Sequence, residues 1–296
     1  MIKYTNEYGL PAAYKNYLEA NPYSKGDADF SITELISPPQ IAILRDRHDY
    51  TVDVSECLDS IYGTVLHQML NDNANNDGTS VPEQRFFTEL EGVEISGAVD
   101  LQTFTNGGVI LDDYKHGFIG TQNFDHPDWE WQLNSYAYLF FCDNGYVPDR
   151  LRISLAFKDW RKANVAKIRD YPERGHMYIE IPVKNMHDVE EYLRNRIKVH
   201  TAADVEPDET LTQCTDSERW HSPDQWAVYE MTKDRKKLKE RASRVLDSES
   251  EAKAWMVANG KKSATIKHRP GVDRRCESYC EVRDFCHQYR RNNDKG

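Results

Sequence analysis

Two apolar runs joined by a short turn constrain the fold of this chain more than any other feature. Residues 93–104 and 108–114 are rich in apolar and β-branched side chains, and the turn between them carries Asn-Gly-Gly. This pattern predicts a β-hairpin. Asp100 lies on the first strand, and Asp113 and Lys115 lie on the second, where residues i and i+2 share a face. We therefore expect two carboxylates and one ammonium group at one surface of the hairpin.

Two carboxylates beside a lysine form the smallest set of groups that metal-dependent hydrolysis of a phosphodiester bond requires. Carboxylates hold Mg²⁺ or Mn²⁺ through oxygen, and a lysine orients or activates the attacking water. A surface hairpin with solvated charges would carry the same residues, because Asp-X-Lys after a strand is common. The neighbouring motifs decide between these two interpretations.

Helices and strands are predicted in alternation on both sides of the hairpin. The helical pattern is expected over 54–71, 129–142 and 186–202, and strands over 85–90, 151–157 and 177–183. This order predicts an α/β core of about 170 residues. The N-terminus lacks the pattern of a signal peptide, and no apolar run reaches membrane-spanning length, so we expect a cytoplasmic protein without a membrane partner.

Positive charge is concentrated in the last part of the chain. Residues 231–296 carry 18 Lys and Arg against 10 Asp and Glu, whereas the rest carries 20 against 39. A basic region on an acidic body indicates a surface for a polyanion, although an ordinary solvated helix has the same composition. We expect a basic helix over 233–246, and we expect the basic, aromatic segment 158–174 to contact a phosphate backbone.

Three of the six cysteines lie close together near the C-terminus. Cys276, Cys280 and Cys286 are spaced C-x3-C-x5-C. In a chain without a secretion signal this spacing indicates a metal site rather than disulfides. With one further cysteine it predicts a four-thiolate site, and two metals remain open. A [4Fe–4S] cluster is favoured over zinc, because zinc sites usually have two C-x2–4-C pairs.

Four motifs follow one another in the order, and on the element types, of a known nuclease family. They are a helix histidine, G-x-x-D, D-x-K and Q-x-x-x-Y, carried by His67, Gly97 with Asp100, Asp113 with Lys115, and Gln132 with Tyr136. Over residues 31–183 the set resembles the RecB-like branch of the PD-(D/E)XK nuclease superfamily. The cysteine-rich end resembles the iron–sulfur nucleases of that branch, which include AddB-type subunits and nucleases of CRISPR adaptation. Length and layout also resemble phage-encoded exonucleases of recombination modules.

The resemblance implies a restriction-endonuclease-like α/β fold, in which helices flank a central mixed sheet, followed by a Cys-rich helical C-terminal segment. It also implies the metal ligands, which are Asp100, Asp113, the main-chain carbonyl of Tyr114, and His67 as an additional ligand. The proline of the family motif is absent, since Val99 precedes Asp100. That departure is common in the RecB-like branch.

The resemblance implies supporting roles for the remaining motif residues. Lys115 would orient and polarise the water, and Gln132 and Tyr136 would support the site or the nucleic-acid strand. An upstream glutamate sometimes accompanies the set, and Glu89 is preferred to Glu91 for this role.

The fourth cluster cysteine departs from the family pattern. In the iron–sulfur members it precedes the histidine motif, but this chain has Ser37-Pro38 at that point. Cys57 and Cys214 are the available replacements. Cys214 is favoured because it lies in a polar, loop-like segment, whereas Cys57 lies in the helix that leads to the histidine. Cys142, in an aromatic helix, is expected to be a buried thiol.

These inferences predict three regions. Residues 1–30 form an N-terminal extension, 31–205 the nuclease core, and 206–296 a basic, Cys-rich region that closes back on the core through a metal cluster. The expected function is a Mg²⁺- or Mn²⁺-dependent DNA exonuclease of phage recombination, repair or degradation, acting in the host cytoplasm if phage-encoded. DNA is the expected partner, with a single-strand annealing protein or another recombination protein beside it, and oligomer formation is left open. The alternatives are a non-catalytic nucleic-acid-binding or assembly module on a nuclease fold, and a zinc-stapled endonuclease.

Overall fold

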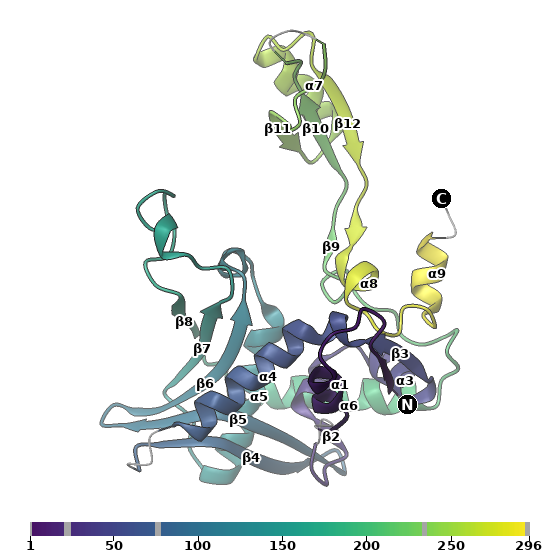
Figure 1. Ribbon diagram of the computed structural model, residues 1–296. Helices are drawn as coiled ribbons and strands as arrows, with labels where there is room; N and C mark the ends of the chain where they lie inside the picture. Colours follow the sequence, from purple (N-terminus) through teal and green to yellow (C-terminus); the bar gives the residue numbers. More distant parts are fainter. Residues whose placement is uncertain (1, 21–24, 75–77, 233–235, 294–296) are drawn as a thin grey trace. The chain divides into compact units, whose positions relative to one another are not determined.

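A computed structural model of the chain describes residues 2–20, 25–74, 78–232 and 236–293 (Figure 1). The chain divides into two compact units, Met1–Leu211 and Thr212–Gly296. In the described ranges no helix has both the length and the apolar character needed to cross a bilayer.

A mixed β-sheet forms the centre of the first unit. Its strands are β2 (Phe30–Ser31), β4 (Ser80–Leu90), β5 (Val93–Thr105), β6 (Gly108–Gly117), β7 (Arg150–Phe157) and β8 (His176–Ile181). The order is β2-β5-β6-β7-β8, and β4 pairs with β5. The pairs β2–β5 and β6–β7 are parallel, whereas β4–β5, β5–β6 and β7–β8 are antiparallel. The predicted α/β fold with a central mixed sheet flanked by helices is confirmed.

The predicted hairpin is present as β5 and β6, whose register runs from Thr105 opposite Gly108 to Leu101 opposite Asp112. Gly108 has a φ of 112°, a conformation that favours glycine. A Cβ atom there would overlap the Asp149 carboxylate, which accepts a hydrogen bond from the Val109 amide. Glycine at position 108 therefore leaves room for the Asp149 side chain, just before β7, to hydrogen-bond to the turn.

Helices cover the sheet and complete the core of the first unit. They are α2 (Ile32–Ile36), α4 (Leu58–Asp72), α5 (Pro127–Asn144) and α6 (Met186–Asp204). Contacts of α5 extend across β4, β5, β6 and β7, and α2 and α6 pack on α5, whereas α4 contacts β5 and β6. Proline begins α5 and Gly145, in the left-handed conformation, ends it. The core consists of fully buried aliphatic and aromatic side chains, among them Ile95, Leu111, Leu133, Phe140, Leu151, Ile153 and Leu193.

Smaller elements complete the first unit. They are β1 (Ile2–Thr5), α1 (Ala12–Ala20), α3 (Pro39–Arg47), β3 (Tyr50–Asp53) and the 3-10 turns η1 (Val54–Cys57), η2 (Ile119–Asn123) and η3 (Lys162–Asn164). Strands β1 and β3 form a parallel pair.

The second unit contains two small antiparallel sheets. One has the order β11-β10-β12, made of β10 (Gln225–Tyr229), β11 (Arg244–Leu246) and β12 (Thr265–Arg269), and α7 (Glu249–Ala258) packs on it. The other pairs β9 (His221–Ser222) with β13 (Val272–Asp273), and α8 (Arg274–Ser278) and α9 (His287–Asn293) follow.

The expected helix over 233–246 is wrong. Residues 233–235 lie outside the described residues, and the described part contains strand β11 and no helix. Within this run, Leu238, Val245 and Leu246 are the large apolar side chains, and they do not form the continuous stripe that a helix packs against its neighbours. Strand β11 instead pairs with β10, where its side chains stay exposed or half-buried.

One further expectation needs correction. Cys142 is exposed rather than buried, because it lies near the end of α5, beyond the part of the helix that the sheet covers. On α4, Ile61 is buried, whereas Val65 and Met69 are about half exposed.

Candidate active site

The two hairpin aspartates and the lysine meet where β5 and β6 separate, beyond the Leu101–Asp112 pair. One carboxylate oxygen of Asp100 accepts a hydrogen bond from the Tyr114 amide at 2.6 Å. Lys115 Nζ lies 2.6 Å from Asp113 Oδ2, and the Asp113 residue is only 2% exposed. The strand alternation predicted from the sequence therefore places Asp113 and Lys115 in direct contact.

Helix α4 brings His67 to the same group. His67 Nδ1 lies 3.5 Å from Asp100 Oδ1, and the imidazole ring meets the Tyr114 ring edge-on with centroids 5.6 Å apart. Burial lowers the pKa of His67, but the hydrogen bond and negative charge of Asp100 outweigh burial and raise this pKa above its usual range. His67 is thus held beside the carboxylate that it was predicted to accompany.

Helix α5 approaches from the other end of the lysine. Lys115 Nζ donates a hydrogen bond to Gln132 Oε1 at 3.0 Å, and Gln132 Nε2 donates one to the Tyr136 hydroxyl at 2.9 Å. Tyr136 packs directly on Gly97, where a Cβ atom would lie 2.8 Å from the Tyr136 ring. Glycine in the G-x-x-D motif therefore makes room for the tyrosine of the Q-x-x-x-Y motif.

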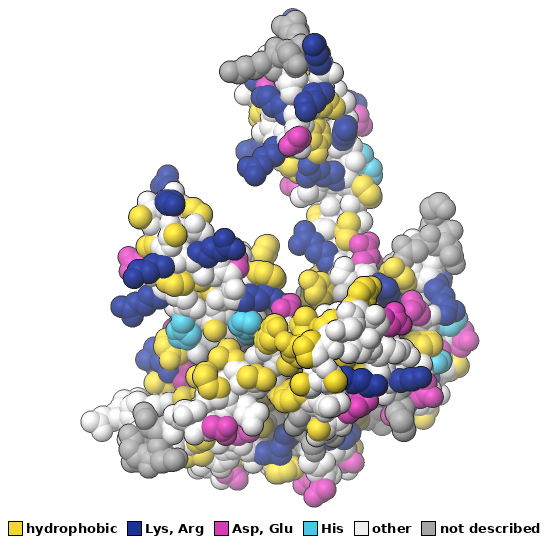
Figure 2. Space-filling model, viewed as in Figure 1, with side chains coloured by type: hydrophobic (Ala, Val, Ile, Leu, Met, Phe, Trp, Pro, Cys, Tyr) yellow, Lys and Arg dark blue, Asp and Glu magenta, His cyan; other side chains and the backbone are white. Residues whose placement is uncertain are grey.

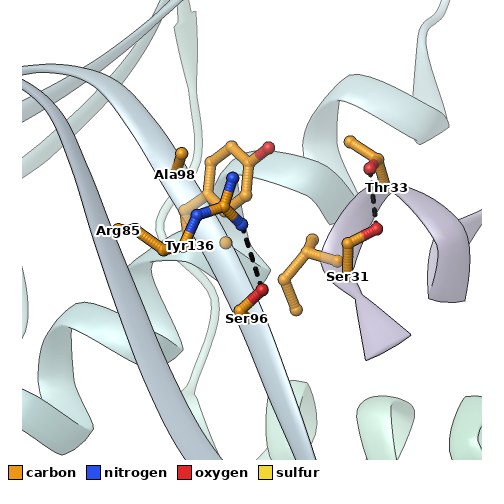
Figure 3. Close-up of a pocket in the computed structure, with 8 residues that line it drawn as sticks. Ser31, Thr33, Arg85, Ser96, Ala98 and Tyr136 are labelled. Atoms are coloured by element: carbon orange, nitrogen blue, oxygen red, sulfur yellow. Dashed lines mark hydrogen bonds between the residues drawn. The ribbon is translucent and has the colours of Figure 1, made fainter. Parts of the chain in front are cut away.

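Tyr136 also lines a small pocket that lies between β4, β5 and the start of α2 (Figure 3). The Arg85 guanidinium donates a hydrogen bond to Ser96 Oγ at 3.0 Å, and the Ser31 and Thr33 hydroxyls lie 3.1 Å apart on the opposite side. The pocket thus continues the polar path that runs from Asp113 through Lys115 and Gln132.

Buried charge dominates the electrostatics of this site. Burial raises the pKa of Asp113, the Lys115 ammonium opposes this rise, and the nearby Asp100 carboxylate adds to it. Burial, together with Asp100, also raises the pKa of Tyr114 to about 12. A divalent cation would favour the ionised form of Asp113, as Lys115 does.

The donors gathered here suit a hard divalent cation. Asp100 and Asp113 offer carboxylate oxygens and His67 an imidazole nitrogen, the ligand types that Mg²⁺ and Mn²⁺ accept. Across the described residues, however, no group of three His, Cys, Asp or Glu side chains is arranged so that it could hold a metal ion. The side chains fit the cation in kind, and Lys115 neutralises Asp113 in the arrangement described.

The upstream glutamate predicted at residue 89 does not lie with this group. Glu89 is exposed and pairs across the hairpin with Glu94, six residues along β5 from Asp100. Glu91, the less favoured choice, forms an ion pair with Arg194 at 2.8 Å. The carboxylate opposite Asp100 is Glu83, which has a φ of 46° and interrupts the ladder between the pairs on either side. Glu83 could be placed opposite Asp100 only from the register of β4 on β5, which the composition of the chain does not reveal.

The four cysteines proposed for a cluster all lie in the second unit. Gln288, 5% exposed, accepts a hydrogen bond from the Cys214 amide and donates one to the Cys214 carbonyl, both at 2.9 Å. This clamp holds Cys214 against the segment that follows Cys286. Cys57, the other choice, lies in the first unit.

The thiols are close enough to influence one another. Burial raises the pKa of Cys214 to about 12, and Cys286 and Cys276 contribute to the rise. Burial also raises the pKa of Cys276 to about 11, with Cys280 the next cause, and the pKa of Cys280 is raised by burial and in part by Cys286. Among the described residues, no three of these thiols are arranged so that they could hold a metal ion.

Comparison with known proteins places the chain in a family. The sequence profile of the PD-(D/E)XK nuclease superfamily matches residues 63–287, a span that runs from α4 to just beyond Cys286. No curated protein matches the chain. The crystal structure of SSO0001 is 15% identical and aligns with a TM-score of 0.43 over 63% of this chain and 82% of that one. A candidate exonuclease from Eubacterium rectale is also 15% identical, with a TM-score of 0.30 over 52% of this chain and 55% of that one.

Proposed function

The chain belongs to the PD-(D/E)XK nuclease superfamily, and on this premise we propose that it is a Mg²⁺- or Mn²⁺-dependent DNA exonuclease of the RecB-like branch. One observation carries the proposal. His67, Asp100, Asp113, Lys115, Gln132 and Tyr136, which are spread over four secondary-structure elements, form a connected set of contacts. Asp113, a buried carboxylate whose pKa burial raises, belongs to this set, and carboxylates of this kind are frequent at functional sites.

The mechanism assigns each side chain one task. The cation would be held by Asp100, Asp113, His67 and the Tyr114 carbonyl. When bound, it would polarise the phosphate as a Lewis acid and lower the pKa of a bound water. Lys115 orients the attacking water and stabilises the negative charge that develops on the phosphoryl oxygens. Gln132 holds the Lys115 ammonium in place, and Tyr136, wedged against Gly97, holds Gln132.

For the second unit we propose a [4Fe–4S] cluster on Cys214, Cys276, Cys280 and Cys286, with zinc as the alternative metal. The Gln288 clamp and the mutual influence of the thiols support this ligand set over one with Cys57. Since all four lie in one unit, the cluster would join the two ends of that unit. This differs from the closure onto the nuclease core that the sequence predicted.

The biological setting that fits this proposal is phage DNA recombination, repair or degradation. A single-strand annealing protein is the partner class that such exonucleases serve. The length and layout of the chain, which resemble those of phage-encoded exonucleases, support this setting.

A nuclease assay tests the proposal. Protein purified without oxygen is incubated with linear and closed circular DNA in Mg²⁺ or Mn²⁺, beside the Lys115→Ala variant. Degradation of linear but not circular DNA by the wild type, lost in the variant, is the expected result. Cleavage of circles would indicate an endonuclease, and DNA binding without hydrolysis by either protein would favour a non-catalytic binding module. Iron and zinc analysis of the same sample decides the metal of the second unit.

A further inference from the structure

The loop between β7 and β8, residues 158–175, leaves the sheet at the edge where the candidate active site lies (Figure 1). Strand β7 runs parallel to β6, with Leu155 paired to Lys115 and Phe157 paired to Gly117. The Lys158 amide then donates a hydrogen bond to the Gly117 carbonyl at 2.9 Å. The β7–β8 loop therefore begins three register positions beyond the lysine proposed to orient the water.

The base of the β7–β8 loop is fastened to the active-site elements. Lys158 forms an ion pair with Asp59 on α4, the helix that carries His67, and its ammonium lies 3.9 Å from the centre of the Phe118 ring. The Asp159 carboxylate accepts a hydrogen bond from the Ile119 amide, at the start of η2. The position of the loop relative to the site is thus set by contacts on two sides.

The loop is also braced internally. Trp160 Nε1 donates a hydrogen bond to the Pro172 carbonyl at 2.9 Å, and the Arg161 amide donates one to the Tyr171 hydroxyl at 2.8 Å. These bonds join the outgoing and returning arms. A braced loop holds the side chains at its tip without the entropic cost of ordering them on binding.

The tip of the loop carries an excess of unneutralised positive charge. Figure 2 shows dark blue side chains gathered on this projection. The β7–β8 loop has five exposed cations along its length, namely Arg161, Lys162, Lys167, Arg169 and Arg174. Arg169 lies 3.5 Å from Asp170, and within the described part of the chain the other four have no carboxylate partner. A row of unpaired cations beside a phosphodiesterase site fits the phosphate backbone of DNA.

One apolar side chain stands among these cations. Ile168, which lies between Lys167 and Arg169, is 49% exposed, and its amide donates a hydrogen bond to the Asn164 carbonyl within a turn. The exposed half of this aliphatic side chain contributes no burial free energy to the fold and is open to a ligand. Isoleucine is one of the side chains that DNA-binding proteins insert between base steps as a wedge.

We propose that the β7–β8 loop engages duplex DNA and that Ile168 separates the last base pair, so that one strand enters the active site. The loop cations hold the phosphates on either side of the opened step. The inference rests on the proposed exonuclease function, because it names double-stranded ends as the substrate of the same site.

The test compares paired and unpaired DNA ends. Wild type, Ile168→Ala and the matched control Val205→Ala, whose side chain is an exposed aliphatic at 83%, are assayed on blunt duplexes and on duplexes with mismatched, frayed ends. We expect Ile168→Ala to slow digestion of blunt ends about tenfold, the loss of about 1.4 kcal/mol at the opened step, and to leave frayed ends unaffected. Val205→Ala is expected to match the wild type on both. Equal rates for Ile168→Ala and wild type on blunt ends, or equal slowing on both ends, would overturn the wedge.

A second readout does not need hydrolysis. In the Asp113→Asn background, binding to a duplex with 2-aminopurine in the terminal pair should raise its fluorescence, and Ile168→Ala should remove most of that rise. If the wild type digests no DNA but the fluorescence rises and depends on Ile168, the proposed exonuclease function fails and the wedge stands. If DNA is digested but the fluorescence never changes, the wedge fails alone.

The cations are tested through salt. The double variant Lys162→Gln/Lys167→Gln should lower duplex affinity and reduce the slope of log affinity against log salt by about two, one for each phosphate contact. Arg150→Gln is the matched control, because Arg150 begins β7 at the opposite end of the strand and pairs with Glu180. An unchanged slope in the double variant would show that the loop does not bind the backbone.

Discussion

The two units of this protein differ in what holds them together. The first has a continuous apolar core in which Phe140, Leu111 and Ile153 are fully buried. In the second, the buried apolar side chains that the structure describes are Ala227, Val228, Ala252, Val282 and Cys286, most of them small. A unit of this size with so little apolar burial usually needs disulfides or a metal to be stable.

The units also use charge differently. The first buries Asp112 and Asp113, and each has a cation beside it, Arg152 and Lys115 respectively. In the second, most cations lie at the surface, Cys286 is buried, and burial raises the pKa values of Cys214 and Cys280. A large core can tolerate the cost of a buried carboxylate and place it at a reactive site, whereas a small core depends on ligation for its own fold.

Cys280→Ser should have the largest effect on stability of the variants considered. If it had no effect, the second unit would not depend on a metal for its fold, and the contrast between the two units would fail. We expect the variant to lose its iron or zinc and the second unit to unfold, because ligation of structural metal contributes on the order of 10 kcal/mol to folding. The first unit should keep its melting transition. Metal analysis and limited proteolysis measure both effects, with Cys142→Ser as the control because that thiol is exposed on α5. If the second unit of Cys280→Ser were folded and free of metal, the proposed stabilisation of this unit by a metal cluster would be refuted.

Asp113→Asn and Asp112→Asn separate function from stability within the first unit. Asp113→Asn should reduce nuclease activity by about 10³-fold, because the carboxylate is proposed to hold the cation. Its melting temperature should change little, because burial opposes the charge of Asp113 and raises its pKa. Asp112→Asn leaves the partly buried Arg152 without its counter-ion and should cost about 3 kcal/mol of unfolding free energy.

Activity of folded Asp112→Asn protein should stay within severalfold of wild type. Kinetics and thermal unfolding of both variants check this pair. If Asp113→Asn protein were fully active, the active site would have to lie elsewhere in the protein.

Gly97→Ala and Gly63→Ala compare a crowded glycine with an open one. A methyl group at Gly97 would press on Tyr136, so we expect a loss of about 2 kcal/mol and lower activity through Gln132. At Gly63, inside α4, a Cβ atom would meet no heavy atom within 4 Å. Alanine there should therefore increase the free energy of unfolding by as much as about 1 kcal/mol. Denaturant unfolding measures both changes. Equal destabilisation by the two substitutions would show that Gly97 does not act through the tyrosine.

Glu230→Gln should have the smallest effect, and it probes the second unit. Hydrogen bonds from Lys261 and then Lys239 lower the pKa of Glu230 from 4.5 to about 2. A folded-state pKa below the unfolded value stabilises above pH 4.5, and this stabilisation disappears as the pH falls through about 2. The variant should therefore melt slightly below wild type at neutral pH, and the difference should vanish in acid. Thermal unfolding between about pH 2 and pH 7 tests this, and a constant difference would contradict it.

Several features of the site were predictable because they depend on local pattern. Residues i and i+2 on a strand share a face, so Asp113 and Lys115 had to meet once β6 formed. Gln132 and Tyr136 are four residues apart and share a face of α5, and Gln132 hydrogen-bonds to both Tyr136 and Lys115. Motif order placed His67 near Asp100, although the two are distant in sequence.

Other features were not predictable, because they depend on pairing between distant segments. The register of β4 on β5 moved Glu89 away from the site and put Glu83 opposite Asp100. The basic run 233–246 had helix-forming residues, but its last part, β11, pairs with β10 in a sheet, where Val245 stays exposed. That outcome depends on a partner strand distant in sequence, which the run itself does not reveal.

The sequence by itself determined the hairpin, the α/β order of the nuclease unit and the chemical set of carboxylates, lysine and histidine. The hairpin, the element order and the meeting of Asp113 with Lys115 follow from side-chain periodicity, which acts over a few residues, whereas the histidine was implied by the resemblance to the nuclease family. Only the tertiary structure decided that Tyr136 fits against Gly97, that Gln288 clamps Cys214, and that the β7–β8 loop rises beside the active site. Each of these depends on strand register and helix packing, in which a shift of one residue redirects every side chain.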